Sequence, residues 1–239
     1  MAIQELHRLK PDPRQNSANH ESTNDAELVA TVTTFDYSEL NDVQLIRSLT
    51  YTINEAFNLS HVQSRALPAS RPRLVDDSAY QTHMGTKGGT LSIVVQHPQS
   101  RAVLATVAAK PYIPLSPEEF GKLTGGREIF TRREVPDGAG SQLWEISLLA
   151  VSPQYQRRGL ASYLMEAVEK RVRQACAARG ATDVTFLLCT IKEINGDFYD
   201  RKGYKRDYAT YQAPGTIGSE TGFTVDFMSE VVVIHGQEK

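Results

Sequence analysis

A basic turn that contains one glycine is the part of this sequence whose residue types best suit binding chemistry. The turn is Gln156-Arg157-Arg158-Gly159-Leu160-Ala161. The preceding residues 143–151 are apolar and predict a buried strand, whereas apolar residues recur at helical spacing over 160–175. A strand that enters a helix in this way leaves N–H groups unpaired at the positive end of the helix dipole, where a phosphate can bind. The same spacing also fits an ordinary helix start with a solvated basic turn.

Residues 151–161 resemble the coenzyme A-binding motif of the GNAT superfamily of N-acyltransferases. The family pattern is Gln/Arg-x-x-Gly-x-Gly/Ala after a strand that ends in a Val-x-Pro-like stretch, and Ala161 takes the place of the last glycine here. A second segment, 195–204, resembles a later helix of the family, in which Phe198-Tyr199 precedes Gly203-Tyr204 by a fixed interval. The two motifs occur in the family's order, joined by a predicted helix and a predicted strand.

The resemblance implies that acetyl-CoA is the co-substrate. The pyrophosphate would lie on the N–H groups of residues 157–162, and the pantetheine arm would pair with Leu149 and Val151 as an added strand. The family's asparagine is expected where this chain has Lys192 or Glu193, so Asn195 is the candidate for that coenzyme contact. The candidate coenzyme-binding residues are Leu149, Ala150, Val151, Gln156, Arg157, Arg158, Gly159, Leu160, Ala161, Ser162, Asn195 and Tyr199.

Two side chains are candidates for catalysis. Glu145 precedes Val151 at the position of the general-base glutamate in histone acetyltransferases of the family, and a carboxylate in an apolar strand is costly without a partner or a task. It could instead face solvent or pair with a nearby basic residue. Tyr199 matches the family's general acid, which protonates the departing thiolate, and the alternative is a packed helix tyrosine.

Composition sets the broad class. With 239 residues and a formal charge of −2, the chain predicts one globular domain over 27–239 and a disordered polar tail over 1–26. The charge gives no drive towards nucleic acid or membrane. Cys176 and Cys189 are too few for a disulfide framework, so we expect two core thiols and a cytoplasmic location. No apolar run is long enough to span a membrane, and the histidines show no metal-ligand spacing.

The expected fold is α/β (α+β): a GNAT fold whose central, mixed, mostly antiparallel twisted sheet of about seven strands has helices on both faces. Asn41 and Gln44 suggest a capping box for a first helix, and a short helix is expected at Ser116-Pro117-Glu118-Glu119. Gly85-Thr86-Lys87-Gly88-Gly89 only faintly resembles a phosphate loop and favours a turn. The expected strands are 28–35, 90–96, 102–109, 142–151, 183–190, 204–212 and 223–235, and the expected helices are 43–57, 74–80, 160–175 and 193–202.

The function expected from these residues is N-acetyl transfer from acetyl-CoA to a primary amine by direct attack in a ternary complex. A small-molecule acceptor is favoured because the connections 111–140 and 213–222 could enclose a compact pocket. A protein lysine or N-terminal acetyltransferase, and a catalytically silent acyl-CoA-binding module, are the alternatives. Family topology places Tyr51, Asn54 and Phe57 on the acceptor side, and a monomer or homodimer is expected.

Overall fold

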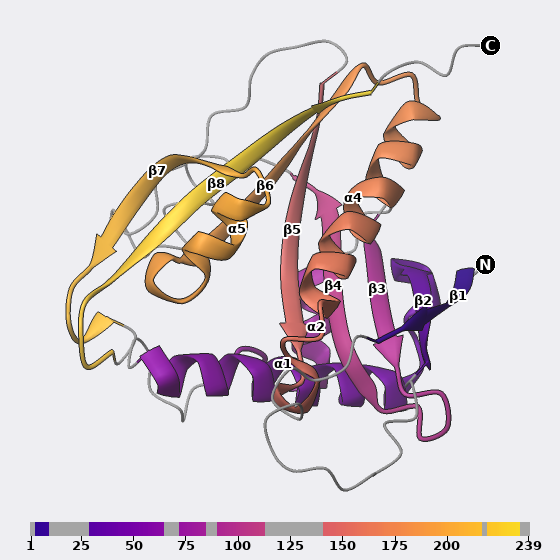
Figure 1. Ribbon diagram of the computed structural model, residues 1–239, viewed down its shortest axis with the longest axis horizontal. Coiled ribbons are helices and arrows are strands. Elements are labelled where there is room, and N and C mark those ends of the chain that lie inside the picture. Colours follow the sequence, from indigo (N-terminus) through magenta and orange to yellow (C-terminus); the bar gives the residue numbers. More distant parts are fainter. Residues whose placement is uncertain are drawn as a thin grey trace, which may run out of the picture. The chain divides into compact units, whose positions relative to one another are not determined.

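The computed structural model describes residues 3–9, 29–64, 72–84, 90–112, 141–216 and 219–234 (Figure 1). The predicted elements at 85–89 and 116–119 lie outside these residues. The strands are β1 (Ile3–Arg8), β2 (Val29–Asp36), β3 (Leu91–Gln96), β4 (Val103–Pro111), β5 (Ser141–Val151), β6 (Asp183–Ile191), β7 (Lys205–Gln212) and β8 (Phe223–Val233). The helices are α1 (Val43–Ser64), α2 (Asp77–Met84), α4 (Leu160–Ala177) and α5 (Asp197–Arg201), with short turns η2 (Tyr37–Glu39), η3 (Pro153–Tyr155) and η4 (Lys192–Gly196).

The strands form one open, mixed sheet in the order β1-β2-β3-β4-β5-β6-β8-β7, flanked by helices. β5 and β6 pair in parallel, whereas the β1–β2, β2–β3, β3–β4, β6–β8 and β7–β8 pairs are antiparallel. The prediction of a mixed, mostly antiparallel sheet is therefore confirmed, with eight strands instead of about seven.

The additional strand, β1, falls inside the predicted tail 1–26, so that prediction is wrong for residues 3–8. Ile3 pairs with Thr34 and Arg8 pairs with Val29, in antiparallel register with β2. Polar residues such as Gln4 and Glu5 hid this strand from a reading based on hydrophobic pattern. An edge strand needs only a partner's backbone, which its own composition does not reveal.

The N-cap of the first helix lies one residue later than predicted. Asp42, and not Asn41, is the N-cap: its Oδ1 accepts the N–H groups of Gln44 at 2.9 Å and Leu45 at 3.3 Å. The helix also continues to Ser64, beyond the predicted end at Phe57. Asp76 caps α2 in the same manner, accepting the N–H of Ala79 at 2.9 Å.

The chain divides into two compact units. Unit 1 comprises Met1–Leu59, Pro72–Lys110 and Ser147–Arg171, and unit 2 comprises Ser60–Arg71, Pro111–Ile146 and Val172–Lys239. Residues of β5 and α4 contribute to both units. The single domain 27–239 stays a prediction.

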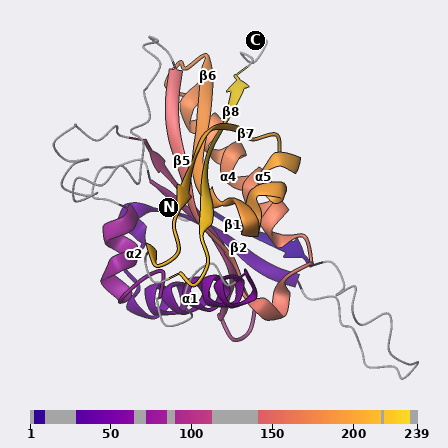
Figure 2. The same ribbon diagram turned by 90° about the vertical axis from the view of Figure 1, so that its left-hand side faces the viewer.

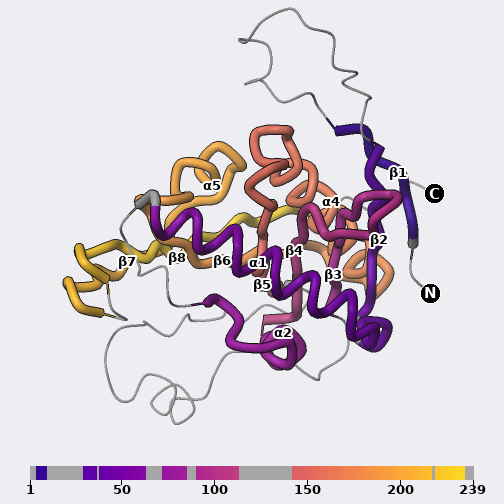
Figure 3. The backbone as a smooth tube through the Cα atoms, turned by 90° about the horizontal axis from the view of Figure 1, so that it is seen from below, coloured from indigo at the N-terminus to yellow at the C-terminus, as the bar shows by residue number. Residues whose placement is uncertain are grey.

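Unit 1 is built around an apolar cluster beneath α1. Ile46, Leu49 and Ile53 of α1 pack with Val94 of β3 and Ala108 of β4, and Figure 3 shows α1 crossing these two strands. α2 lies beside α1 (Figure 2). The segment before α2 is fixed to α1 because the Asn54 side chain accepts the N–H of Leu74 and donates to its carbonyl, both at 2.8 Å.

Helix α4 covers the opposite face of the unit 1 sheet. Side chains alternate along β1, so Gln4 and His7 point to opposite faces. Gln4 lines a cavity together with residues of α1, whereas the His7 ring stacks on Tyr163 of α4 with ring centroids 3.8 Å apart. Glu5, on the same side as His7, forms an ion pair with Arg171 of α4. Helices therefore lie on both faces of the sheet within this unit, as expected.

Unit 2 holds the paired strands β6, β8 and β7 with η4 and α5. Trp144, Phe186 and Cys176 are fully buried here, as the sequence predicted for Cys176. Cys189 was also expected in the core, but it is exposed on β6. Thr185 and Leu187 lie on the same face of β6 and are buried, so the cover of this face ends before Cys189, which the apolar pattern of the strand could not reveal.

Candidate active site

The turn between β5 and α4 is fixed by a short set of hydrogen bonds within unit 1. After β5 ends, the Ser152 N–H donates to the carbonyl of Leu104 at 2.8 Å, and the Ser152 hydroxyl lies 3.4 Å from Oε2 of Glu55. Tyr155 N–H then closes η3 on the Ser152 carbonyl at 2.8 Å. The Gln156 side chain returns to the carbonyl of Val151 at 3.3 Å. The basic motif therefore starts from an anchored backbone.

Two residues of the motif have left-handed backbone. Arg157 has φ 64° and Gly159 has φ 83°. Glycine adopts this conformation without a steric penalty, whereas a residue such as arginine loses about 1–2 kcal/mol. The two arginines also differ in their surroundings: Arg157 is exposed, and Arg158 is half-buried with its guanidinium carbon 5.6 Å from the centroid of the Tyr155 ring.

Helix α4 begins directly after this turn, and the N–H groups of its first residues have no partner within the helix. The first bond of α4 runs from the Tyr163 N–H to the Gly159 carbonyl at 3.0 Å, so the N–H groups of Leu160, Ala161 and Ser162 precede the helical ladder. Leu160 is fully buried and anchors the first turn. In addition, the buried Nε of Arg158 has no hydrogen-bond partner among the described residues. These donors can together hold a pyrophosphate.

The strand segment before the turn contains a backbone irregularity. Leu148 has φ 51° inside β5, a conformation that marks a bulge in a strand of L-residues. The parallel pairing of β5 with β6 runs from Ser141 to Glu145. The three residues that follow Leu148 are Leu149, Ala150 and Val151, which are the candidates for the pantetheine arm.

Glu145 lies on the part of β5 that belongs to unit 2. It is opposite Leu187 of β6 in the parallel register. Its neighbours Trp144 and Ile146 are buried, whereas Glu145 itself is half-buried on the other face. The carboxylate is therefore neither in the apolar core nor fully in solvent.

Tyr199 is the third residue of α5 in unit 2, with 9% of its surface exposed. Its ring makes edge contacts with Phe198 and Tyr204, at centroid distances of 5.1 and 6.0 Å. Burial raises the pKa of the phenol, and the nearby Cys189 raises the pKa further. The hydroxyl consequently stays protonated at neutral pH, as a proton donor must.

Asn195 lies in η4, the π-helical turn that leads into α5. Its side chain is exposed, and its carbonyl accepts the N–H of Asp197. Glu193 is one of the two positions where the family's asparagine was expected. Its side chain binds β8 instead, because both carboxylate oxygens accept the N–H of Thr224 at 3.0 Å.

A buried carboxylate beneath η4 had no place among the predicted site residues. Asp226 of β8 is fully buried, and its Oδ2 lies 2.8 Å from Nη2 of Arg206 on β7. A Cβ on Gly196 would lie 3.8 Å from the same oxygen. The polar interruption of an apolar strand was the one sequence signal that pointed to this residue.

The acceptor-side candidates separate into structural and exposed residues. Asn54 is held by Leu74, and the Phe57 ring lies beneath the Arg73 guanidinium at 5.8 Å. Tyr51 is largely exposed. The contacts of Asn54 with Leu74 and of Phe57 with Arg73 fix α1 against the segment before α2.

His83 lies in the last turn of α2. Its Nε2 is buried without a hydrogen-bond partner among the described residues, and its carbonyl accepts Nζ of Lys110 at 2.8 Å. Burial, together with the charges of Lys110 and Arg73, lowers the pKa of the imidazole to about 4. The side chain is therefore neutral at pH 7.

The candidate residues thus fall into two groups. The residues from Leu149 to Ser162 lie together in unit 1, and Glu145, Asn195 and Tyr199 lie in unit 2. Among the described residues, no cluster of His, Cys, Asp and Glu is arranged to hold a metal ion. No helix in the described ranges is both long and apolar enough to cross a membrane.

Comparison with known proteins bears on this arrangement. The model of the acetyltransferase (GNAT) domain matches residues 120–206. The NatC complex bound to Gag peptide and CoA is similar in fold, with a TM-score of 0.51 and 11% identity over 84% of this chain and 99% of that chain. Arabidopsis thaliana NAA60 in complex with acetyl-CoA has a TM-score of 0.46 and 16% identity, over 84% of this chain and 98% of that one. Aminoglycoside 6'-acetyltransferase type Ii has a TM-score of 0.45 and 14% identity, over 85% of this chain and 97% of that one. No curated protein matches the chain at a significant level.

The domain match assigns residues 120–206 to the acetyltransferase (GNAT) domain, and the similar structure shows the same fold. That match covers 87 of the 239 residues.

The buried imidazole of His83 generates a prediction about acid stability. Its pKa is about 4 in the folded protein and about 6.5 in an unfolded chain. The unfolded state therefore binds more protons between these values, and the free energy of unfolding falls as pH decreases from 6.5 to 4. In His83→Gln, which does not titrate there, the melting temperature should fall less steeply over this range. An NMR titration in which His83 changes protonation near pH 6.5 would contradict this assignment.

Proposed function

We propose that this chain transfers an acetyl group from acetyl-CoA to a primary amine of a small molecule, by direct attack in a ternary complex. The observation that carries the proposal is the left-handed Gly159 at the start of α4, followed by the N–H groups of residues 160–162. An anion that approaches this backbone gains several hydrogen bonds and the positive end of the helix dipole. The pyrophosphate of the coenzyme is the anion that a GNAT enzyme must hold.

The phosphate-binding role is divided among backbone and side chains. N–H groups of residues 157–162 bind the pyrophosphate, and Arg157 and the unpartnered Nε of Arg158 add charge and donors. Gln156 helps to fix the turn through its bond to Val151. The backbone of Leu149, Ala150 and Val151 pairs with the pantetheine arm, and the Leu149 N–H polarises the thioester carbonyl. Asn195 is the remaining coenzyme contact.

Deprotonation of the acceptor is the first chemical problem. A lysine-like amine with a pKa of about 10.4 is neutral in only about one molecule in 2500 at pH 7, a scarcity equivalent to about 4.6 kcal/mol. Glu145, half-buried on β5, is the proposed base, acting directly or through a water molecule. The amine then attacks the carbonyl carbon, the carbon–sulfur bond breaks, and Tyr199 donates its proton to the thiolate.

Two other functions remain distinguishable by experiment. A protein N-terminal or lysine acetyltransferase is the first, since a NatC complex is among the similar folds. A silent acyl-CoA-binding module is the second. Release of free coenzyme A thiol, measured with a panel of amines, amino acids and peptides, separates the three. Turnover with peptides alone would replace the small-molecule acceptor, and coenzyme binding without turnover by any amine would favour the silent module.

The first prediction from this function concerns coenzyme binding. Acetyl-CoA should raise the melting temperature because it binds the native state, and Gly159→Glu should abolish that shift. The substitution places a side chain and a negative charge where the pyrophosphate rests, at a left-handed residue. Gly180→Glu, at another left-handed glycine with open space around it, is the matched control and should keep the shift. Coenzyme affinity that survives in folded Gly159→Glu excludes this site.

The second prediction concerns Tyr199. Tyr199→Phe retains the buried ring and its contacts with Phe198 and Tyr204 but removes the proton donor. We expect turnover to fall by about 10- to 1000-fold with little change in coenzyme affinity. The control is Tyr204→Phe, which changes the neighbouring buried tyrosine and should retain activity. Wild-type turnover in Tyr199→Phe would place the general acid elsewhere.

The third prediction concerns Glu145 and the type of acceptor. Glu145→Gln should lose most activity near neutral pH and regain it as pH approaches the pKa of the amine, because free amine then forms without a base. The loss should be greater for a lysine-like amine than for an α-amine, since their deprotonation penalties differ by about 3 kcal/mol. The measurement is a pH–rate profile of both enzymes with one acceptor of each kind. Parallel profiles would leave Glu145 without a role as base.

A further inference from the structure

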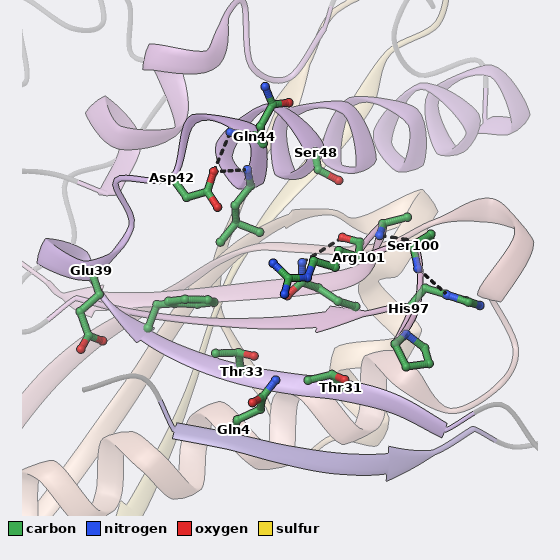
Figure 4. Close-up of a pocket in the computed structure, with 15 residues that line it drawn as sticks. Gln4, Thr31, Thr33, Glu39, Asp42, Gln44, Ser48, His97, Ser100 and Arg101 are labelled. Carbon is green, nitrogen blue, oxygen red and sulfur yellow. Dashed lines mark hydrogen bonds between the residues drawn. The ribbon is translucent and has the colours of Figure 1, made fainter.

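A cavity lies in unit 1, and none of the candidate coenzyme-binding and catalytic residues lines it. It has a volume of about 770 Å³ and is formed by β1, β2, the start of α1 and the turn that joins β3 to β4 (Figure 4). Small-molecule sites typically measure about 300–1,000 Å³, so the volume suits a metabolite. Its lining residues all fall between positions 4 and 102, whereas the coenzyme motif begins at Leu149.

Arg101 occupies an unusual backbone position at this cavity. It has φ 56°, and the turn around it is closed by the Arg101 N–H to the His97 carbonyl and by the His97 N–H to the Ala102 carbonyl, both at 2.9 Å. The Gln96 side chain also donates to the Arg101 carbonyl at 2.9 Å. Such a position favours glycine. Arginine stands here instead, and Arg101 makes no ion pair with any residue that the structure describes.

A carboxylate lines the cavity from a different wall. Asp42 caps α1 through Oδ1 alone, which accepts the N–H groups of Gln44 and Leu45. Its Oδ2 has no hydrogen bond within the described part of the chain. Figure 4 shows Arg101 lying between Asp42 on the α1 side and Thr33 on the β2 side. Glu39 of η2 also lines the cavity, but its Oε2 accepts the N–H of Asp36 at 3.1 Å. The cavity therefore presents Arg101 as a cation and two carboxylates, of which Asp42 lies at the start of α1.

Neutral hydrogen-bonding groups complete the lining on the sheet side. Thr31 and Thr33 face the cavity from β2, and Gln4 reaches it from β1, where it is the register partner of Thr33. Hydroxyl and amide groups on a sheet face that elsewhere carries apolar residues suit a polar ligand.

We propose that this cavity binds a small zwitterion that carries a carboxylate and an ammonium group, such as a free amino acid or a dipeptide. The carboxylate pairs with the Arg101 guanidinium, and the ammonium group pairs with Asp42. Thr31, Thr33 and Gln4 bond the remainder of the ligand. The proposal goes beyond acetyl transfer, because it assigns a second ligand to residues that take no part in binding the coenzyme.

The test uses the full chain without acetyl-CoA. Each of the common L-amino acids and a set of glycyl dipeptides is tested by thermal shift, and Kd values follow by calorimetry. For any ligand that binds, the N-acetyl form lacks the ammonium group and the amide form lacks the carboxylate. We expect at least one zwitterion to bind, with each blocked form at least tenfold weaker. The absence of any binding zwitterion overturns the proposal, as does equal affinity for a blocked form.

Substitutions at Arg101 separate binding from folding. Arg101→Gly suits the left-handed backbone and should keep or raise the melting temperature, while zwitterion affinity falls at least tenfold. Arg101→Lys retains the charge and should bind more tightly than Arg101→Gly. Arg47→Ala, which changes an exposed arginine of α1 outside the cavity, should bind as wild type. Wild-type affinity in Arg101→Gly overturns the assignment.

We expect a substitution at one ligand site to leave binding at the other site unchanged. Arg101→Gly should keep the thermal shift produced by acetyl-CoA, and Gly159→Glu should keep zwitterion binding. Loss of both ligands in Arg101→Gly would contradict a separate second site. Loss of acetyl-CoA binding in wild type, with zwitterion binding intact, would instead contradict the proposed acetyltransferase function.

Discussion

A backbone cannot leave a strand and enter a helix without presenting N–H groups that neither element pairs, and in this chain they follow Gly159. The hydrogen bonds of Ser152 to Leu104 and of Gln156 to Val151 hold the strand end in place. The buried Leu160 holds the helix start. Because both sides of the turn are fixed, its donors are preorganised, and an anion that binds them does not have to order the loop.

Local motifs were predictable because the interactions that create them are local. The basic turn, the helix after it and the Phe198-Tyr199 pair each depend on residues close in sequence, and all lie where the sequence placed them. The strand β1 was missed because its stability comes from the backbone of β2, with which it shares no sequence neighbourhood. The environments of His83 and Asp226 were beyond prediction for the same reason, since Lys110 and Arg206 reach them from other elements.

Burial distinguishes the two ionisable candidates in unit 2. Tyr199 lies among aromatic rings, where loss of solvent favours the neutral phenol. Glu145 keeps contact with solvent on a face that alternates with buried residues. Sequence could identify both residues, but the degree of burial depends on α5 and on the pairing of β5 with β6. The difference in burial between the proposed acid and the proposed base is thus set by tertiary structure.

Both end strands of the sheet order, β1 and β7, carry charged residues, whereas β2, which β1 covers, has few. β7 carries Lys205 and Arg206, and charges of this kind discourage edge-to-edge pairing. β2 has no such protection of its own: Val29, Thr31 and Thr33 face neighbours only because β1 covers that edge. A shortened chain that begins after β1 would therefore expose the edge of β2, a strand rich in β-branched residues whose one charged residue is Asp36, and such an edge favours aggregation. By covering this edge, residues 3–8 should contribute to solubility as well as to the fold.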